Sequence, residues 1–302
     1  MKAFKRQRAL FAGIAGLFAV APAAAGDLTW TNTSGNFQWN TSTANNWSSG
    51  VAWNNANVDS AIFNSAGAGA ITVFPPITLR GMQFTANGYG LQGGTLTLVS
   101  GGSGSLGVGE IQVGAGVATT IQSNISGSVA LNKTGTGTLT LSGANTYTGG
   151  LLASAGTLNL TGSNTLVTAS AIVNNATMNL TGGGGIASTS GAVGDTAGTT
   201  GTANISGGTW TNSGGLTVGT LGNGTLTITG GGTVNNVIGY LGAQATGSGT
   251  ATIGGGTGTS TWNNNNDLYV GDRGTGLLTL TGGGVILSRT GVVGRLAGST
   301  GT

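Results

Sequence analysis

Short stretches in which Leu, Ile or Val alternates with Thr, Asn or Ser recur along the chain, and each one is followed by glycine. The phrase T-L-T-L or a close variant begins at Thr95, Thr138, Thr157, Thr177 and Thr225, and it returns as L-L-T-L at Leu277. Alternation with a period of two is typical of a β-strand that buries one face. Glycine after the strand is typical of a tight turn. A strand-and-turn unit repeated many times predicts a stacked repeat protein.

A second repeat begins after Ala192. Each unit opens with two residues, usually both apolar, and a glycine. A polar turn and the phrase G-x-L-x-I-x-G-G follow. We align the following starts: Val193-Gly194, Val218-Gly219, Ile238-Gly239, Val270-Gly271 and Val293-Gly294. Their mean spacing is about 25 residues, as expected for one rung of a solenoid. A longer period also exists, because T-W-T-N around Trp210 returns as T-W-N-N around Trp262, 52 positions later. Two rungs therefore form one sequence unit.

These periods predict an all-β solenoid whose stacked rungs bury a continuous column of Leu, Ile and Val. About ten rungs at 4.8 Å each would form a rod roughly 50 Å long. Leu226 should point into the column, and Thr and Asn should form hydrogen-bonded ladders between rungs. Pro75-Pro76 should lie at a corner or a strand start, because proline cannot donate to a strand ladder. A sandwich or a closed barrel would also contain many short strands, but the regular repeat favours the solenoid.

Composition narrows the class of protein. The 302 residues include 63 glycines, no cysteine and no histidine, and 5% of them are charged. Glycine without a G-X-Y period excludes collagen, and alternating apolar residues with so little charge argue against a disordered chain. The lack of histidine and cysteine removes the usual catalytic triads and most zinc and transition-metal sites.

Residues 1–25 have the pattern of a secretory signal peptide. Four basic residues within positions 2–8 precede an apolar run, and Ala23 and Ala25 form the A-x-A cleavage pattern, which predicts cleavage after Ala25. The remaining chain has five basic and six acidic residues, a net charge of −1. A basic surface for nucleic acid is therefore not expected.

Residues 26–65 form a Trp- and Asn-rich segment that contains Trp30, Trp39, Trp47 and Trp53. We interpret it as a short N-terminal β cap whose aromatic side chains close the first rung, because an open solenoid end would present an unpaired strand edge. The alternative is an exposed aromatic platform on which sugar rings would stack.

Residues 131–158 carry the most specific wording in the chain. K-T-G-T-G-T-L-T-L-S-G from Lys133, A-N-T-Y-T-G-G from Ala144 and A-G-T-L from Ala155 closely resemble the passenger-associated transport repeat, also called the autotransporter-associated β-strand repeat. Leu151-Leu152 departs from the polar residues usual at that place. The units after Ala192 and the Trp-rich segment also resemble those of large bacterial autotransporter-type surface proteins.

The resemblance implies a right-handed parallel β-helix that is exported and displayed at the cell surface, associated with the outer membrane or released outside the cell. The change of repeat type divides the β-helix into residues 66–191 and residues 192–302. The second part stops inside a repeat, so we expect a fragment of a longer protein; the alternative is a short secreted relative. The function implied is an adhesive or structural stalk without catalysis. Its expected partners are host or matrix glycans and proteins, other cells, and an outer-membrane translocator barrel outside this chain.

No catalytic, cofactor-binding or metal site is predicted. The nearest candidates are Asp267, Asp272 and Arg273, with Asp195 at a turn equivalent to that of Asp272. We expect these aspartates to bond their own turn backbone. Two alternatives are a β-helical polysaccharide lyase or hydrolase and a weak calcium contact, although a dedicated calcium cage would need more carboxylates. Runs such as Gly182 to Gly185 lack a following Lys-Ser/Thr and are expected to be corners rather than phosphate loops.

Overall fold

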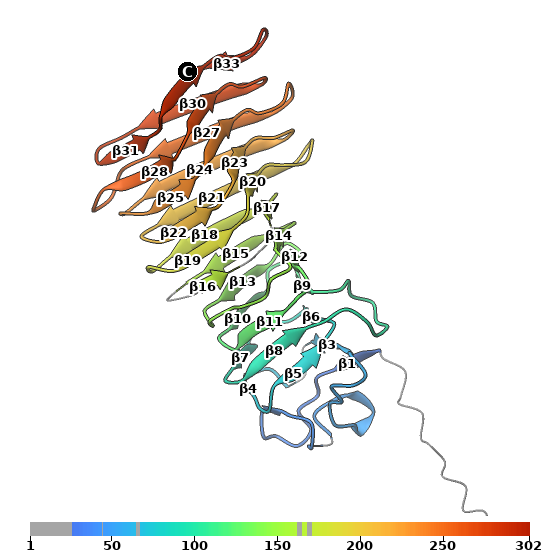
Figure 1. Ribbon diagram of the computed structural model, residues 1–302. Helices are drawn as coiled ribbons and strands as arrows, with labels where there is room; N and C mark the ends of the chain where they lie inside the picture. Colours follow the sequence, from blue (N-terminus) through green and yellow to red (C-terminus); the bar gives the residue numbers. More distant parts are fainter. Residues whose placement is uncertain (1–25, 44, 65–66, 162–164, 168–170) are drawn as a thin grey trace, which may run out of the picture.

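The chain coils into a rod of stacked rungs, with the first and last rungs at opposite ends (Figure 1). The computed structural model describes residues 26–43, 45–64, 67–161, 165–167 and 171–302. The predicted signal peptide lies outside the described residues. Each rung contributes up to three strands, and each strand pairs in parallel with the equivalent strands of the rungs beside it. The predicted β-solenoid is confirmed, and its two long sheets contain twelve strands each.

Three faces surround the core. The first long sheet consists of β1 (Asp27–Thr29), β3 (Ser60–Phe63), β6 (Gly81–Phe84), β9 (Glu110–Val113), β12 (Leu131–Thr134), β14 (Leu151–Ala153), β17 (Ile172–Asn174), β20 (Gly191–Val193), β23 (Gly215–Val218), β26 (Ile238–Leu241), β29 (Asp267–Val270) and β32 (Thr290–Val293). The second long sheet consists of β2 (Gln38–Trp39), β4 (Ala70–Val73), β7 (Gly90–Gln92), β10 (Ala118–Ile121), β13 (Thr138–Leu141), β15 (Thr157–Leu160), β18 (Thr177–Thr181), β21 (Thr200–Ser206), β24 (Asn223–Thr229), β27 (Ser248–Ile253), β30 (Thr275–Leu280) and β33 (Thr300–Gly301).

The third face is divided into two shorter sheets. The first comprises β5 (Ile77–Leu79), β8 (Thr95–Leu98) and β11 (Asn124–Gly127), and the second comprises β16 (Thr165–Val167), β19 (Gly185–Ser188), β22 (Thr209–Asn212), β25 (Thr233–Asn236), β28 (Ser260–Asn264) and β31 (Gly284–Leu287). A single 3-10 turn, η1 (Ser48–Gly50), is present among the described residues. In the same residues there is no helix long and apolar enough to span a membrane.

Alternating side chains of each strand fill the core. In β24, Leu226 and Ile228 are fully buried, while Thr225 and Thr227 face outward. Leu226 is aligned with Ala203 on one side and Ala251 on the other. Its predicted inward orientation is confirmed. Burying one such side chain stabilises the fold by about 1.5–3 kcal/mol. Neighbouring rungs bury many such side chains together in continuous columns.

The register corrects one start in the second repeat. Hydrogen bonding aligns Val193, Val218, Leu241, Val270 and Val293 in one column. Leu241-Gly242, rather than Ile238-Gly239, is therefore the equivalent of Val218-Gly219. The prediction for Ile238 was wrong because a V-G or I-G pair can sit at a strand start as well as at its end. Strand pairing, which sequence spacing alone does not show, decides between the two.

The two-rung sequence unit is confirmed by the packing of the tryptophans. Trp210 and Trp262 occupy the same column on the third face, with Val234 between them. Both rings are fully buried. The Trp210 indole N–H donates to Ser188 Oγ over 3.2 Å, and the Trp262 indole N–H donates to Asn236 Oδ1 over 2.7 Å. A large ring in every second rung alternates with a small residue, so a column of constant width is filled without overlap.

A ladder of amides runs along the outside of the second long sheet. Asn159 donates to Thr140 Oγ1 over 3.4 Å, and Asn179 and Asn204 each donate over 2.8 Å to the asparagine of the preceding rung. The predicted Thr and Asn ladder is confirmed for these four rungs. Asn159 and Asn179 each use both a donor and an acceptor, which holds adjacent rungs in register.

The four tryptophans of the N-terminal segment lie inside the first rungs. Trp30, Trp39, Trp47 and Trp53 are at most 1% exposed. Trp47 is central, with its ring centroid 5.2 Å from that of Trp30, 5.0 Å from that of Trp39 and 4.8 Å from that of Trp53. The interpretation as a closing aromatic core agrees with this burial. The alternative of an exposed sugar platform at these residues is wrong, because no ring face is accessible.

Gly219, which follows the buried Val218, is required by its left-handed backbone conformation and by its close contact with the next rung. Gly219 has a φ of 74°, and a Cβ there would lie 2.2 Å from the Ser248 carbonyl oxygen of the next rung. Gly198 has a similar φ of 77° in an open turn, with no atom within 4 Å of a Cβ. The two positions therefore share the cost of the left-handed conformation but differ in contact.

We expect Gly219→Ala to destabilise the protein by about 1–3 kcal/mol more than Gly198→Ala, because only the first variant overpacks the rung interface. Urea unfolding of both variants, followed by circular dichroism, measures the difference. Equal losses would contradict the close rung-to-rung contact at Gly219.

Candidate functional site

Two of the three aspartates singled out in the sequence are paired with arginines of the following rung. Asp267, on the outward face of β29, lies 3.3 Å from the Arg289 guanidinium and accepts a hydrogen bond from the Tyr269 hydroxyl over 3.3 Å. Asp272, in the turn after β29, forms an ion pair with Arg295. The expectation that Asp272 bonds its own turn is therefore wrong. The sequence could not show this pairing, because the arginine comes from the next rung.

Asp195 and Asp272 occupy equivalent corners but do not come together. They follow Gly194 and Gly271, which are separated by three rungs of the same column. Three rung spacings amount to roughly 14 Å. No group of three or more carboxylates or other metal-binding side chains is present among the described residues. The arrangement thus brings Asp267, Asp272 and Arg273 to one face and leaves Asp195 apart.

Tyrosine and arginine form an outward stack beside these ion pairs. Tyr240 of β26 is aligned with Tyr269 of β29, and their rings are stacked with centroids 5.2 Å apart and an interplanar angle of 13°. The Arg295 guanidinium lies over the Tyr269 ring, 4.7 Å from its centroid. Burial raises the pKa of Tyr240, and the charge of Asp272 adds to that effect while Arg295 opposes it.

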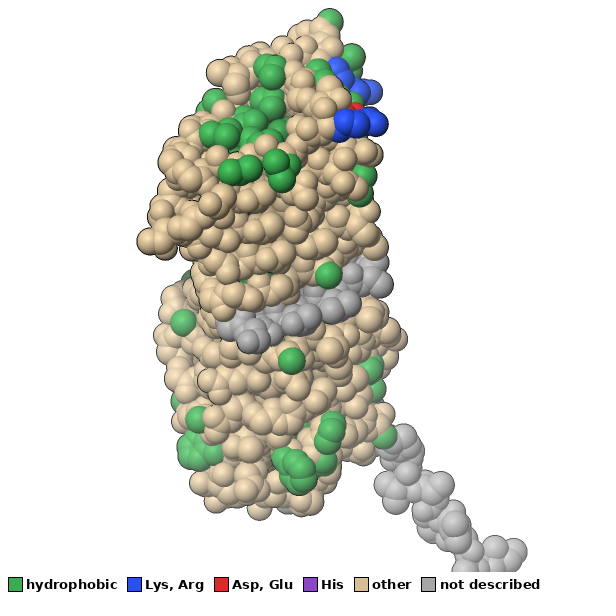
Figure 2. Space-filling model, turned by 60° about the vertical axis from the view of Figure 1, so that its left-hand side comes forward, with side chains coloured by type: hydrophobic (Ala, Val, Ile, Leu, Met, Phe, Trp, Pro, Cys, Tyr) green, Lys and Arg blue, Asp and Glu red, His purple; other side chains and the backbone are tan. Residues whose placement is uncertain are grey.

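A hollow of about 280 Å³ opens beside Tyr240. It is lined by Thr217, Thr220, Tyr240, Ala243, Gln244, Asp272, Arg273 and Arg295. We call this set the Tyr240 hollow. Figure 2 shows the basic side chains gathered near the C-terminal end of the rod, on a surface that otherwise has almost no charge. Sequence analysis missed the two tyrosines, because they come together only through the alignment of rungs whose lengths differ.

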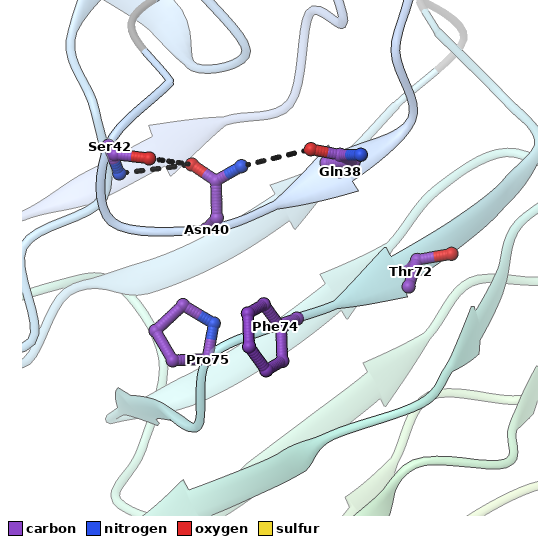
Figure 3. A pocket seen from close by; sticks show the side chains of 6 residues that line it. All are labelled: Gln38, Asn40, Ser42, Thr72, Phe74 and Pro75. Carbon is purple, nitrogen blue, oxygen red and sulfur yellow. Dashed lines mark hydrogen bonds between the residues drawn. The ribbon is translucent and has the colours of Figure 1, made fainter.

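A second hollow, of about 410 Å³, lies at the N-terminal end between β2 and β4 and the segments that follow them (Figure 3). The Phe74 ring is 73% exposed there, next to Pro75. In Figure 3 the Asn40 amide points away from this pair, toward Ser42 and Gln38. It accepts from Ser42 N over 3.0 Å and donates to Thr43 Oγ1 over 2.9 Å. Pro75-Pro76 joins β4 to β5, as predicted for a corner.

Lys133 is the buried cation of the described chain. Its side chain is fully buried, and its ammonium donates to the carbonyl oxygens of Thr134, Gly135 and Ala155 over 2.8, 2.7 and 3.1 Å. Burial lowers the pKa of Lys133 to about 8. Two of these carbonyls belong to the corner of its own rung and the third to the corner of the next rung. The lysine therefore ties two successive corners together from inside the coil.

The chain interrupts the third face in the same rung. Between β13 and β14 the residues form no named strand, although Thr146 N and Thr148 N donate to Ile125 O and Gly127 O over 2.8 and 2.9 Å. The Asn145 side chain accepts from Ile125 N over 2.8 Å. This segment thus attaches to β11 of the preceding rung, and the Tyr147 side chain is fully buried behind it.

The comparison with family models identifies this rung and the one that follows. The model described as the passenger-associated-transport-repeat matches residues 131–160. We call residues 131–160 the transport repeat. The resemblance recognised over residues 131–158 is confirmed. The transport repeat comprises β12 to β15. Its lysine is the buried Lys133, and its A-N-T-Y-T-G-G phrase is the segment between β13 and β14 that interrupts the third face.

The transport repeat departs from the usual wording at Leu151-Leu152 without disturbing the coil. Leu151 is buried and aligned with Leu131, while Leu152 is half-buried and faces outward beside Asn132. The apolar side chain of Leu151 extends the interior column. The outward position of Leu152 tolerates a polar or an apolar side chain.

A curated relative extends the similarity beyond the transport repeat. Over 170 residues the chain is 38% identical to the protein named Adhesin BmaC autotransporter from Brucella suis biovar 1 (strain 1330). The match covers 52% of this chain and 5% of that relative, so the chain spans a small part of the relative's length. No solved structure matches the chain. The similarity to autotransporter passengers inferred from the sequence is thus confirmed.

Proposed function

We propose that this chain is part of an exported autotransporter passenger, displayed at the cell surface as an adhesive or structural rod without catalysis. The observation that carries the proposal is the architecture. Parallel rungs form an extended rod with a polar, nearly uncharged outside, and they contain a transport repeat. The relative with the printed name of adhesin supports the adhesive role. An extended polar surface suits contact with large partners, such as host or matrix glycans, matrix proteins or other cells.

The acidic residues support a non-catalytic role. Hydrolysis of a glycosidic bond needs carboxyl groups that are available to move a proton. Here Asp267 and Asp272 are each paired with an arginine of the next rung. We also propose that residues 1–25 direct export and that a translocator supplied outside the described chain displays the rod.

We expect beads coated with the mature chain, residues 26–302, to bind epithelial cells or extracellular matrix more strongly than beads coated with the same chain after heat denaturation. Bead retention under flow measures the difference. Equal retention would contradict the adhesive role and leave a mechanical spacer.

A polysaccharide-cleavage screen tests the absence of catalysis. Cleavage by the unsubstituted chain that is lost in both Asp267→Asn and Asp272→Asn would contradict it.

A further inference from the structure

The shape of the Tyr240 hollow follows from the size of aligned residues. In the outward column of the first long sheet, Thr217 precedes Tyr240 and Tyr269. In the adjacent corner column, Thr220 and Ala243 follow Gly219 and Gly242, and Asp272 and Arg295 follow Gly271 and Gly294. In the outward column the step from a small to a large side chain lies between the rungs of β23 and β26, and in the corner column it lies between the rungs of β26 and β29. These steps create a recess walled by an aromatic ring and by charged groups.

One tyrosine face is available in this recess. The two faces of Tyr269 are covered by Tyr240 on one side and by the Arg295 guanidinium on the other. The opposite face of Tyr240 looks toward the rung of Thr217, whose side chain is too small to cover it. An aromatic face at the edge of a recess is a surface on which the C–H face of a sugar ring stacks.

A polar side chain lies beside this face. The Gln244 side chain is exposed and lines the hollow. Its amide group both donates and accepts hydrogen bonds, as sugar hydroxyl groups require.

The charge of the recess specifies the class of sugar. Arg289 and Arg295 are paired with Asp267 and Asp272. Arg273 is exposed and forms no ion pair with any described residue. Of the other described basic residues, Arg80 donates to main-chain carbonyls and Lys133 is buried. Arg273 is therefore the cation in this part of the chain that is free to bind an anion, and its planar guanidinium suits a carboxylate or a sulfate.

We propose that the Tyr240 hollow binds an acidic sugar unit of a polysaccharide, with the ring stacked on Tyr240 and its carboxylate or sulfate group on Arg273. The proposal rests on the adhesive role and names the ligand class for one site on the rod. The Gln244 amide would bind a hydroxyl group of the same unit. Because the free energy at this single site comes from one stack and one ion pair, tight attachment requires several rods on one cell to bind units of the same polymer.

Binding of the mature chain to four surface-immobilised polymers tests the proposal by surface plasmon resonance. Polygalacturonate carries carboxylates, heparin carries sulfates, dextran is neutral, and poly-glutamate is acidic without sugar rings. We expect binding to polygalacturonate or heparin, or both, and at least tenfold weaker binding to dextran and poly-glutamate. The response to polygalacturonate against heparin distinguishes the carboxylate from the sulfate. Raising the salt concentration should weaken binding, because Arg273 is exposed.

Substitutions in the hollow provide the decisive comparison. We expect Tyr240→Ala and Arg273→Gln each to weaken binding to the acidic polysaccharide at least tenfold. Phe74→Ala, in the N-terminal hollow, and Arg289→Gln, on an exposed ion pair of the same end, are matched controls that should bind as the unsubstituted chain does. Circular dichroism melts establish that all four variants are folded, and Tyr240→Phe provides a gentler second variant that should retain stacking.

Any one of four results would contradict the proposed binding site. These are equal binding to dextran, equal binding to poly-glutamate, no binding to any acidic polysaccharide, or unchanged affinity in both hollow variants. If beads still adhere to cells or matrix in any of these cases, the proposed adhesive function stands and only the site is wrong. If beads do not adhere at all, the adhesive function itself fails.

Discussion

Replacement of Leu226 by aspartate is expected to lower the free energy of unfolding by about 3–5 kcal/mol, the cost of an unpaired charge in a protein interior. Leu226 is fully buried in β24, between Ala203 and Ala251 of the adjacent rungs. The apolar column offers no partner for a carboxylate. In a stacked protein this loss also weakens the contacts of both neighbouring rungs, so the thermal transition should shift sharply downward.

Thr227→Asp is the matched control for this prediction. Thr227 is the next residue of the same strand and faces outward. A carboxylate there stays hydrated, and a change within about 0.5 kcal/mol is expected for a surface substitution. Thermal and urea unfolding followed by circular dichroism measures both variants. Similar melting for the two variants would contradict the placement of Leu226 in the column.

The stability of the protein is expected to rise between pH 8 and pH 10 because of Lys133. Burial lowers the pKa of this lysine from 10.5 in the unfolded chain to about 8 in the folded one. Between these values the unfolded chain retains a proton that the folded chain has released, so the free energy of unfolding increases with pH. The slope from one proton is at most about 1.4 kcal/mol per pH unit. Below pH 8 the lysine is charged in both states and this slope disappears.

Lys133→Met should lack this rise, and urea unfolding at several pH values from 7 to 10 compares the slopes. Burial raises the pKa of Tyr89 and Tyr147 in the folded state, so these tyrosines oppose stability only where the unfolded chain begins to lose its tyrosine protons, near pH 10. The lysine contribution is therefore separable below that value. Lys133→Gln, which keeps a donor for the corner carbonyls, serves if the methionine variant is too unstable. Parallel slopes in all three proteins would contradict the role of Lys133.

Local pattern was a reliable guide to strands and interior positions. The alternation in T-L-T-I predicted that Leu226 and Ile228 would be buried, and both are. The 52-residue spacing predicted the shared column of Trp210 and Trp262. The transport-repeat wording predicted the rung that begins at Leu131. These features depend on residues near one another in the chain or on a strict repeat, and both are visible in one sequence.

Contacts between rungs were less predictable. Ile238-Gly239 matched the repeat in letters, yet strand pairing selected Leu241-Gly242. Lys133 counted in the sequence as one more positive charge, whereas the fold places its ammonium inside the coil against three carbonyls. The ion pairs of Asp267 and Asp272 depend on arginines one rung later. Each case depends on which residues stand above one another, and rung lengths vary enough to shift that alignment.

By itself, the sequence determined a repetitive all-β chain with a transport repeat, because a period of two and a recurring glycine turn suffice to specify stacked strands. Only the tertiary structure decided which side chains meet at the surface. It buried the four N-terminal tryptophans, stacked Tyr240 on Tyr269 and left Arg273 without a carboxylate. The physical reason is that strand registry sets which side chains from successive rungs become neighbours, and registry is a property of the paired backbones rather than of any one segment.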